Sequence, residues 1–589
     1  MRSLRFLRLA PICFLIAFVL QTTWSIVTTS PTFDEPYHIV RSYVYLRTGD
    51  SALLKWGGHP PLANLVHVLP LLLRPDIRIP THEAGWPQVR SFADVFQVAD
   101  EFLWRLGNDP ERIMGLARVS AVGLALALAG VLLLWTRQMN YTRRIATSQA
   151  QMLASPAAVA LASLLFCFDP NIIAHSGLVT TDIGAALLIF LSSYCLWRFC
   201  VHPSWPRLLV VGITFGLAQA TKFSALSLVL AFGVLLLMWV FEKDGPSEAF
   251  PVPGQGRFGQ QRTIRSLYRV ATLMVIISVV GFVALWAVYG FELQPLLPHE
   301  SEHALLDRLL PVGSPASRRI VYHLAEAIRV PAPSYFSELA WLRQYAEKGH
   351  PSFIMGRYGV QGWWFYFPIA FMIKTPIPVL LLLAATALLC FRERRAESNE
   401  RYLLVPMLFL SLSSVFSSID IGYRNIIPLL PFAYTYVSRL AVRSTSGLAR
   451  AGLLTLCLWH VLGTCAVAPH YLAYFNELVG GPRQGYRYLV DSNLDWGQDL
   501  KNLGSYLDRR GIEELYLDYF GTADPGYYGI QYLPMPSEAP ANDAPAAYYA
   551  ISATQLQGVY GRQDASLHWL HQYAPIDNVG FSIFIYRLP

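Results

Sequence analysis

Two adjacent carboxylates, Asp34 and Glu35, stand a few residues beyond the first apolar stretch of the chain. A carboxylate at this position could accept a proton from a hydroxyl or an amine, or hold such a group in place. The same residues also fit the start of a helix, with Asp34 as the cap and Pro36 in the first turn. The motif alone leaves catalysis and capping equally open, so both carboxylates are candidate catalytic residues.

Two further polar positions could serve the same chemistry. His59 precedes a Pro-Pro break and could contact a phosphate or an acceptor, although an ordinary loop histidine is the better interpretation of the residue alone. Asp182 follows Val-Thr-Thr between two apolar stretches. A carboxylate at the head of a membrane helix is costly if it faces lipid at depth. We therefore expect Asp182 to face a cavity, unless it caps the helix at the interface.

Three isolated cations, Lys222, Lys374 and Arg424, are expected at the outer ends of helices. Cations are less common there than on the cytoplasmic side of membrane proteins. Together they could bind a lipid phosphate, Arg424 through its forked guanidinium and the lysines as point charges. Each could instead extend toward lipid headgroups. Convergence is not visible in a sequence, so the phosphate site is a hypothesis.

Long apolar stretches must position these residues, and stretches of about 17–25 residues can cross a membrane as helices. They lie near residues 8–29, 113–135, 156–170, 181–200, 207–220, 223–241, 269–290, 364–391, 402–419, 426–442 and 450–468. We expect an all-α polytopic membrane protein with about eleven transmembrane helices. No convincing small-residue cleavage site follows the first stretch, which is expected to be an uncleaved signal anchor. The stretches 207–220 and 223–241 are expected to be two separate spans.

The basic residues predict the topology. With the N-terminus inside and an odd number of spans, the short cytoplasmic loops carry an excess of Arg and Lys. Those residues are Arg137, Arg143 and Arg144, the basic residues from Lys243 to Arg269, then Arg392, Arg394, Arg395 and Arg401, and finally Arg439, Arg443 and Arg450. The membrane domain would then cover 1–468, with a first outer loop at 30–112 and a large outer loop at 292–363. The tail, 469–589, has strand-like pieces and is expected to form an extra-cytoplasmic α/β domain.

Composition supports a membrane protein. Hydrophobic residues make up 54% of the chain and charged residues 14%, against roughly 25% charged residues in soluble domains. Of the 46 basic and 39 acidic residues, 7 and 13 lie from Pro469 onward, which leaves +13 before the tail and −6 within it. A basic membrane part suits membrane lipids or an anionic lipid substrate. Nothing indicates binding to nucleic acid.

The tail contains an acidic run that resembles a calcium loop in part. Asp491, Asn493 and Asp495 occupy the first, third and fifth places, but Trp496 and Asn502 replace the required Gly and Glu. A capped, acidic helix start is the better interpretation. No nucleotide-binding glycine loop, dinucleotide loop or His-Glu-x-x-His motif is present. We therefore assign no cofactor and no metal-binding residues from the sequence. Use of a divalent cation is left open.

A series of short motifs, taken in their order along the chain, resembles that of the GT-C membrane glycosyltransferases. The resemblance is to the bacterial branch that uses phospholipid-linked sugars, near the protein O-mannosyltransferases of glycosyltransferase family 39 and the aminoarabinose transferases. The motifs are Phe33-Asp-Glu-Pro-Tyr-His38 with Gly49-Asp50, His59-Pro-Pro-Leu62, Leu178-Val-Thr-Thr-Asp182, Gly216-Leu-Ala-Gln-Ala-Thr-Lys-Phe223, Trp363-Trp-Phe-Tyr366 with Lys374-Thr-Pro376, Gly422-Tyr-Arg424 with Pro428 and Pro431, and Tyr471 to Glu477 through Asp495-Trp-Gly-Gln498.

The resemblance implies inverting transfer of a sugar from a polyprenyl-phosphate carrier, on the outer face of a bacterial plasma or inner membrane. It implies that Asp34 is the catalytic base or positions the acceptor, with Glu35 beside it and Asp182 as a second acidic site. Lys374, Arg424 and, less securely, Lys222 would bind the carrier phosphate. His59 and Tyr37 complete the substrate-binding candidates. The acceptor could be a lipid, a glycan or a protein.

Two other classes of function remain open. A transporter or flippase of lipid-linked sugars could use the same charged residues along a path, although the span lengths show no inverted repeat. A scaffold or receptor whose tail binds a partner is the third candidate. Transfer of a labelled sugar by the purified protein separates the enzyme from both.

Overall fold

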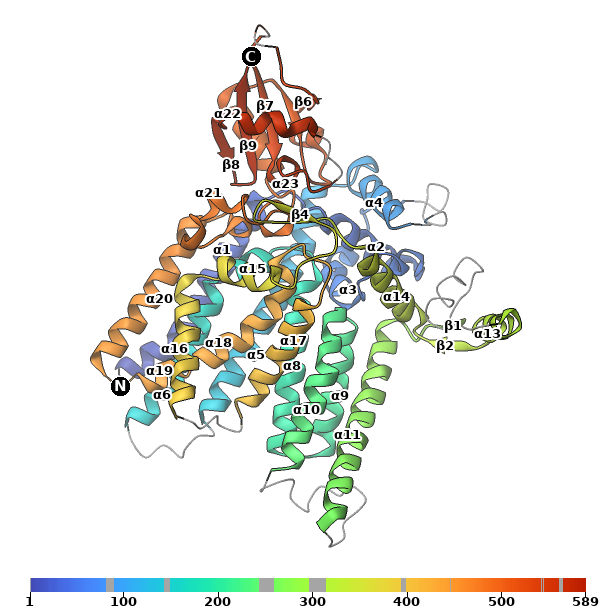
Figure 1. Cartoon of the computed structure of the whole chain (residues 1–589), viewed down its shortest axis with the longest axis vertical. Helices are drawn as coiled ribbons and strands as arrows, with labels where there is room; N and C mark the ends of the chain where they lie inside the picture. The colour runs from blue at the N-terminus through green and yellow to red at the C-terminus, as the bar shows by residue number, and fades with distance from the viewer. Residues whose placement is uncertain are drawn as a thin grey trace.

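The computed structural model describes residues 2–80, 89, 91–141, 149–242, 259–295, 314–393, 399–444, 446–541, 543, 545–560 and 565–589. Long helices form a bundle, and a domain containing a β-sheet stands at one end of it (Figure 1). The expected class, a helical membrane protein with a C-terminal α/β domain, is confirmed. The basic segments 142–148, 243–258 and 394–398, which contributed to the topology prediction, lie outside the described residues.

Six of the described helices are long and apolar enough to cross a membrane, or up to eight if two bent pairs each count as one span. The six lie in α1 (Arg2–Thr28), α5 (Pro110–Tyr141), α8 (Thr181–Val201), α10 (Ser227–Val240) with the 3₁₀ turn Phe223–Leu226, α11 (Gly259–Val288) and α20 (Gly447–Val467). The bent pairs are α6 (Gln149–Cys167) with α7 (Pro170–Ser176), and α15 (Tyr366–Lys374) with α16 (Ile377–Glu393).

The remaining predicted spans coincide with shorter helices, so the count by length is lower than the expected eleven or so. They are α9 (Trp205–Gln219), α17 (Arg401–Val415), the 3₁₀ segment Tyr423–Leu429 with α18 (Leu430–Val437), and α19 (Leu440–Arg443). The stretches predicted at 207–220 and 223–241 are indeed separate helices, divided at Ala220 to Lys222. Polar side chains at such breaks can face an internal cavity instead of lipid.

Proline and a carboxylate cap account for the bends. α15 and α16 meet at 110°, where Thr375 is extended and precedes Pro376. A residue before proline avoids the helical conformation, so the helix ends there. α6 and α7 meet at 64°, where Asp169 caps α7 by accepting from the N–H groups of Asn171 and Ile172, each at 2.9 Å. The residues at the bends, Asp169 and Thr375, are fully buried.

Close packing of α9 on α11 depends on glycine. A Cβ atom at Gly216 would lie 2.0 Å from the carbonyl oxygen of Gly281, and one at Gly212 would lie 2.6 Å from Val280 Cβ. Small residues at such positions let two helix backbones approach, which is how many membrane helices associate. The contact fixes the end of α9, and with it the turn that carries Lys222.

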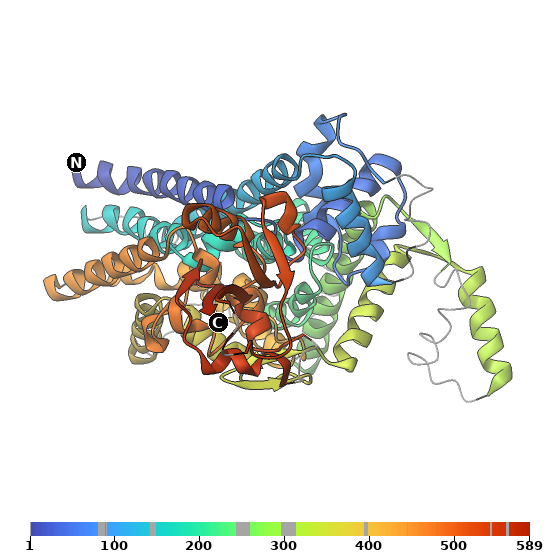
Figure 2. The same ribbon diagram turned by 90° about the horizontal axis from the view of Figure 1, so that it is seen from above.

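Two segments outside the spans lie beside the ends of the bundle helices. The first contains α2 (Glu35–Thr48), the 3₁₀ turn Ala52–Lys55, α3 (Leu62–Val68) with the 3₁₀ turn Leu69–Leu73, α4 (Phe92–Asp100) and the π turn Glu101–Arg105. The second contains β1 (Leu293–Pro295), α13 (Pro315–Ala327), β2 (Arg329–Pro331), α14 (Pro333–Lys348), β3 (Ser352–Ile354) and β4 (Arg357–Gly359). α13 projects away from the molecule in both views (Figures 1 and 2), whereas α14 packs against the first segment.

The tail has two parts. From Tyr471 to Trp496 its apolar side chains belong to the same buried core as the helix bundle. Beyond them, the helix α22 (Leu500–Arg510) packs on a five-stranded sheet of order β6-β5-β7-β9-β8. The tail elements are α21 (Pro482–Gly485), β5 (Glu514–Asp518), β6 (Gln531–Pro534), β7 (Ala547–Ser552), α23 (Ala553–Leu556), β8 (Asp577–Val579) and β9 (Ile583–Leu588). β5 is parallel to β6 and β7, and β9 is antiparallel to β7 and β8. Seen from above, this domain lies over the helix bundle (Figure 2).

Candidate functional site

A cavity of about 800 Å³ lies where the ends of several helices meet the two loop segments and the tail. Six of the eight residues predicted to form the site line it: Asp34, Tyr37, His59, Asp182, Lys222 and Arg424. They come from positions up to 390 residues apart in the chain. The structure therefore brings together groups whose convergence the sequence left open. Glu35 and Lys374 are not among the residues that line this cavity.

Asp34 and Arg424 form an ion pair on the lining of the cavity. Its Oδ2 accepts a hydrogen bond of 2.9 Å from Arg424 Nη1, and the two side chains are 16% and 10% exposed. Asp34 stands at the start of α2, but its side chain accepts no capping hydrogen bond there. Burial raises the pKa of the Asp34 carboxyl above its ordinary value, although the charge of Arg424 opposes this. The geometry thus decides against the capping interpretation and leaves an ionisable carboxyl at the cavity.

Asp182 makes the second ion pair of the cavity. Its Oδ1 accepts a 2.6 Å hydrogen bond from Lys222 Nζ, which also donates to Asn425 Oδ1 at 2.9 Å. Asp182 Oδ2 is buried and has no hydrogen-bond partner among the described residues. The residue before α8 makes no side-chain cap either, so Asp182 is held by the lysine and not by the helix end. Asn425 follows Arg424 directly, so the two ion pairs lie side by side.

Aromatic and imidazole rings surround the first ion pair. The Arg424 guanidinium lies 4.2 Å from the centre of the Trp496 ring, in a cation–π arrangement. Tyr37 packs on His38, and His38 lies 5.5 Å from His59 between ring centres. Burial lowers the pKa of His59 to about 3, reinforced by the nearby Lys222 and Arg424 charges. His59 is therefore neutral at physiological pH and can offer a hydrogen bond, not a positive charge.

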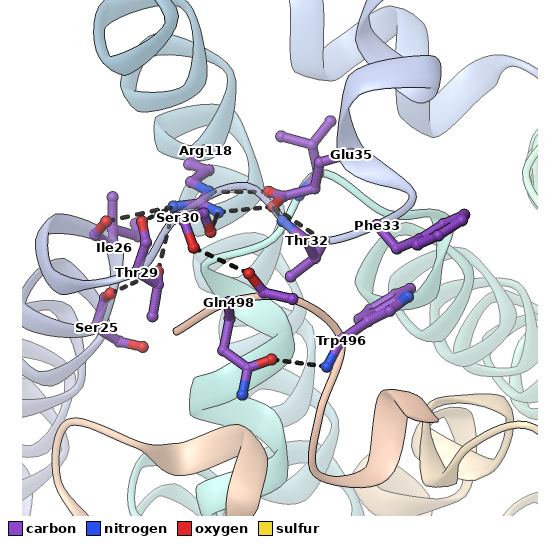
Figure 3. A network of polar contacts seen from close by, with 12 residues as sticks. Ser25, Ile26, Thr29, Ser30, Thr32, Phe33, Glu35, Arg118, Trp496 and Gln498 are labelled. Atoms are coloured by element: carbon purple, nitrogen blue, oxygen red, sulfur yellow. Dashed lines mark hydrogen bonds and ion pairs between the residues drawn. The ribbon is translucent and has the colours of Figure 1, made fainter. Parts of the chain in front are cut away.

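Glu35 lies away from the cavity lining and is paired with Arg118 of α5 (Figure 3). Arg118 Nη2 and Nε donate to its two carboxylate oxygens at 2.6 and 2.9 Å, and the backbone N–H groups of Thr32 and Val179 donate at 2.8 and 2.9 Å. Burial would raise the pKa of Glu35, but these partners lower it below its ordinary value. The predicted catalytic neighbour of Asp34 thus sits in a fully hydrogen-bonded structural network.

The same network connects the tail to the start of the first segment. Arg118 also donates to the carbonyl oxygens of Thr29 and Ser30, and Ser30 N–H donates to the Gln498 carbonyl at 2.9 Å. Phe33 N–H donates to the Trp496 carbonyl at 2.8 Å (Figure 3). The backbone on both sides of Asp34 is therefore fixed by α5 and by the tail.

Lys374, predicted to bind phosphate, is buried at the bend between α15 and α16. Its Nζ donates to the Leu472 carbonyl at 2.9 Å and to the Asn493 carbonyl, and it lies 4.8 Å from the Phe475 ring centre. The ammonium group therefore ties the bent helix pair to the tail. Its side chain does not reach the cavity occupied by Lys222 and Arg424.

Several lining residues were not predicted as part of the site. Asp491, Trp496, Phe520 and Tyr560 come from the tail, and α14 contributes Trp341 and Tyr345. The Asp491 carboxylate accepts from the Tyr560 hydroxyl, and its backbone has φ 57°, a left-handed conformation that is costly for a residue other than glycine. The sequence offers two signals here: the acidic run at Asp491, which favours a helix start, and Trp496 within the motif Asp495-Trp-Gly-Gln498.

No group of three or more His, Cys, Asp or Glu residues in the described part of the chain is arranged to hold a metal ion. Asp495 and Asp499, the other acidic members of the calcium-like run, are turned away from the cavity. Asp495 Oδ2 accepts from Thr554 N–H at 2.7 Å, and Asp499 Oδ2 accepts from Ser582 Oγ at 2.7 Å. These two carboxylates therefore join segments of the tail to one another.

Residues 148–292 match the family described as dolichyl-phosphate-mannose-protein mannosyltransferase. This segment carries Asp169, Asp182 and Lys222, so it includes one of the two ion pairs of the cavity. The match confirms the resemblance to this glycosyltransferase family and supports glycosyl transfer as the class of activity. A comparison by sequence with curated proteins gives no match.

Two solved structures are similar in outline. ArnT from Cupriavidus metallidurans, in a crystal structure bound to undecaprenyl phosphate, is 12% identical, with 98% of this chain and 97% of that chain covered and a TM-score of 0.45. The Archaeoglobus fulgidus oligosaccharyltransferase, tethered to an acceptor peptide containing the NVT sequon, is 10% identical, with 89% and 60% covered and a TM-score of 0.37.

Proposed function

We propose that this protein is a membrane glycosyltransferase that moves a sugar from a polyprenyl-phosphate carrier to an acceptor, with inversion at the anomeric carbon. The observation that carries the proposal is one cavity lined by two partly buried ion pairs, Asp34 with Arg424 and Asp182 with Lys222. The cavity lies at the ends of membrane-type helices, where a lipid carrier and a polar acceptor could both reach it.

The two cations suit a phosphate leaving group. Arg424 can bind phosphate oxygens as a fork, and Lys222 can add a second positive charge as negative charge develops on the leaving oxygen. A donor phosphate would compete with the carboxylate of Asp34 for the Arg424 guanidinium. Binding of the donor would then free Asp34 for the acceptor, so that the resting ion pair keeps the base inactive until the donor is present.

Asp34 is then the general base. The acceptor oxygen attacks the anomeric carbon while the bond from that carbon to the phosphate oxygen breaks. The acceptor proton passes to the Asp34 carboxylate, and the carrier leaves as the polyprenyl monophosphate. A single displacement of this kind inverts the anomeric configuration, whereas a carboxylate nucleophile would retain it. Asp182 holds Lys222 in place and offers its free Oδ2 to a sugar hydroxyl.

The two predicted residues that lie outside the cavity take positioning roles. Glu35 fixes the backbone next to Asp34 through Arg118, and Lys374 fixes the bent helix pair to the tail. His59 and Tyr37 line the cavity beside the first ion pair and would contact the transferred sugar or the acceptor. No step in this scheme requires a metal ion, although a divalent cation could accompany the donor phosphate.

The ends of two membrane-type helices line one side of the cavity and suggest where the lipid carrier would enter. Ser413, Ser414 and Phe416 at the end of α17 line the cavity, as does Leu226 before α10. These helix ends would admit the carrier chain from the surrounding membrane lipids. The positive-inside distribution of basic residues in the sequence supports an orientation in which this end of the bundle, and the tail with it, faces the outside of the bacterial plasma or inner membrane.

Purified protein incubated with radiolabelled undecaprenyl-phosphate hexoses and pentoses tests the proposal. We expect cleavage of one donor, with release of undecaprenyl phosphate and label in an acceptor or in free sugar. The same donors placed inside sealed vesicles test the alternative. Movement of intact donor across the vesicle membrane, without cleavage of any donor, would contradict the proposal and identify a flippase.

A further inference from the structure

Eight aromatic side chains on the cavity lining form a closed circuit of ring contacts. In order around the circuit they are Phe33, Phe96, Phe92, Trp341, Tyr345, His350, Tyr560 and Phe520, which again contacts Phe33. Neighbouring ring centres are 5.0 to 5.7 Å apart throughout. All eight line the cavity that holds the two ion pairs. We call this set the aromatic collar.

Three separate parts of the chain build the collar. Phe33, Phe92 and Phe96 belong to the first loop segment, and Trp341, Tyr345 and His350 to α14 and the residues after it. The tail closes the circuit with Phe520 and Tyr560, which stack at an interplanar angle of 4°. None of these positions lies in a helix long and apolar enough to span a membrane. The whole collar is therefore built by segments outside the candidate membrane spans.

Internal contacts hold the collar in place. α14 is fixed to α2 by a buried ion pair, in which Arg41 Nη2 donates to Glu338 Oε1 at 3.1 Å, and Tyr289 donates to the other Glu338 oxygen. The tail is fixed to Phe33 by the hydrogen bond from Thr522 Oγ1 to the Phe33 carbonyl, at 3.1 Å. Each ring contact adds about 0.5–1.5 kcal/mol. The rings are therefore preorganised and need little ordering when a ligand arrives.

The collar leads directly to the proposed base. Phe33 is the residue before Asp34, and the Tyr560 hydroxyl donates to Asp491, whose charge acts on Asp34. A group that contacts the collar can therefore place a hydroxyl within reach of the Asp34 carboxylate. The donor also needs a route for its lipid tail. The ends of α17 and α10, which line the same cavity, would provide that route.

We propose that the aromatic collar is the acceptor subsite and that the acceptor is a neutral sugar ring. This inference rests on the proposed transferase function and names its acceptor class. A pyranose presents a face of C–H groups that packs on aromatic rings, while its hydroxyls point outward at the edge of the ring. Aromatic faces with a few polar groups are the usual construction of a site that must bind such an amphipathic ligand.

Charge favours a neutral sugar over an anionic acceptor. The collar contains no Lys or Arg, and the two cations that line the cavity, Lys222 and Arg424, are each already paired with a carboxylate. Asp491 adds a carboxylate beside Tyr560, which would repel a phosphorylated lipid or an acidic peptide. Its oxygens and the side chain of Gln555, which also lines the cavity, suit the hydroxyls of a sugar.

Acceptor kinetics with a Trp341→Ala variant test the collar. The probes are methyl hexopyranosides, a peptide rich in Ser and Thr, and a phosphorylated glycolipid, each offered with the donor that the wild-type protein cleaves. We expect label in a methyl hexopyranoside, with a KM that rises roughly tenfold in Trp341→Ala and recovers in Trp341→Phe. Cleavage of the donor by water should keep its wild-type KM for the donor. Trp364→Ala, an exposed tryptophan outside the cavity, should leave all constants unchanged.

A binding measurement keeps the two proposals apart. Saturation-transfer NMR on the full-length protein should show strong transfer to the C–H protons of the methyl hexopyranoside and weaker transfer in Trp341→Ala. Absence of donor cleavage would overturn the transferase function, and the NMR signal would still decide whether the collar binds sugar. Label in the peptide or the phosphorylated glycolipid alone, or an unchanged pyranoside KM in Trp341→Ala, would overturn the collar as a sugar subsite.

Discussion

Asp34 and Glu35 are consecutive and each is paired with an arginine, yet they occupy two different regions of the molecule. Asp34 lines a cavity and makes one hydrogen bond to Arg424, which itself lines that cavity. Glu35 accepts from Arg118 and from two backbone N–H groups, with no exposed surface. One carboxylate can change partner when a ligand enters, whereas the other cannot do so without disrupting the structure around it.

The difference teaches that the environment, not the residue type, separates the carboxylate that we propose as the base from the structural one. Burial moves the pKa of Asp34 upward, while the many donors around Glu35 hold its pKa below the ordinary value. A buried, fully hydrogen-bonded ion pair is costly to break from one side. A carboxylate paired only with a cavity cation is available for proton transfer once an anion takes that cation.

The largest effect on stability is expected from breaking the structural pair. Glu35→Ala leaves Arg118 buried without its charge partner, which should lower the free energy of unfolding by about 3–5 kcal/mol. The midpoint of thermal unfolding in detergent measures this. Asp76→Ala, which removes an exposed partner of Arg74, is the control and should leave the midpoint nearly unchanged. Equal unfolding midpoints for Glu35→Ala and the control would contradict the structural role given to Glu35.

Lys222 at the cavity and the buried Lys374 repeat the comparison, with smaller expected effects. Lys222→Met should raise the KM for the donor by roughly tenfold or more, because a charge-assisted hydrogen bond to phosphate contributes about 1.5–3 kcal/mol. Lys374→Met should leave that KM unchanged and lower stability, because the Leu472 and Asn493 carbonyls lose their donor. Steady-state kinetics and unfolding midpoints of both variants decide the matter. A raised donor KM in Lys374→Met would restore the sequence-based prediction that this residue binds phosphate.

A pH profile sharpens the assignment of Asp34. The base must be deprotonated, so transfer should rise with pH through the pKa of Asp34, which burial raises above the ordinary value of 3.8. Arg424 opposes that shift in the free enzyme, so its removal in Arg424→Gln should move the acidic limb of kcat/KM for the donor, which reports the free enzyme, to higher pH. The limb should stay in place in Lys374→Met. If the acidic limb does not move in Arg424→Gln, Asp34 is not the group whose deprotonation controls the rate.

Much of this architecture could be predicted from the sequence because the length of an apolar stretch is a local signal. Helices lie at the predicted stretches, and the tail strands at Glu514–Asp518 and Ile583–Leu588 follow the predicted strand-like pieces. The number of full-length spans could not be predicted as well. Proline and cap residues such as Pro376 and Asp169 bend helices that hydropathy counts as continuous.

The site was predicted in part, for a geometric reason. Neighbouring residues at a helix start point about 100° apart, as the 3.6-residue helical repeat requires. One of two adjacent carboxylates can therefore face the cavity while the other faces α5, and composition cannot say which. Lys374 is predicted as a phosphate ligand because it is an isolated cation expected at the outer end of a helix and because its Lys-Thr-Pro motif resembles the family's. The structure instead has a 110° bend at this position, and the Lys374 ammonium donates to the tail.

The tail and α14 contributions were missed because they depend on long-range packing. Phe520 contacts Phe33, which lies 487 residues earlier in the sequence, and the nearby Thr522 donates to the Phe33 carbonyl. Tyr560 joins the site through its contacts with Phe520 and His350. Isolated aromatic residues in a chain with 13% aromatic content carry no local signal. The collar becomes visible only when three segments are brought together.

The most direct test of the central claim compares Asp34→Asn with Glu35→Gln in a single-turnover transfer assay at saturating donor. Rates are expressed per folded protein, as measured by the unfolding transition. Asp34→Asn should transfer about 10²–10⁴-fold more slowly than the wild type and keep its unfolding midpoint, whereas folded Glu35→Gln should transfer within about tenfold of the wild-type rate and unfold at a lower temperature. Transfer by Asp34→Asn at the wild-type rate, or equal losses of rate in both folded variants, would contradict the account.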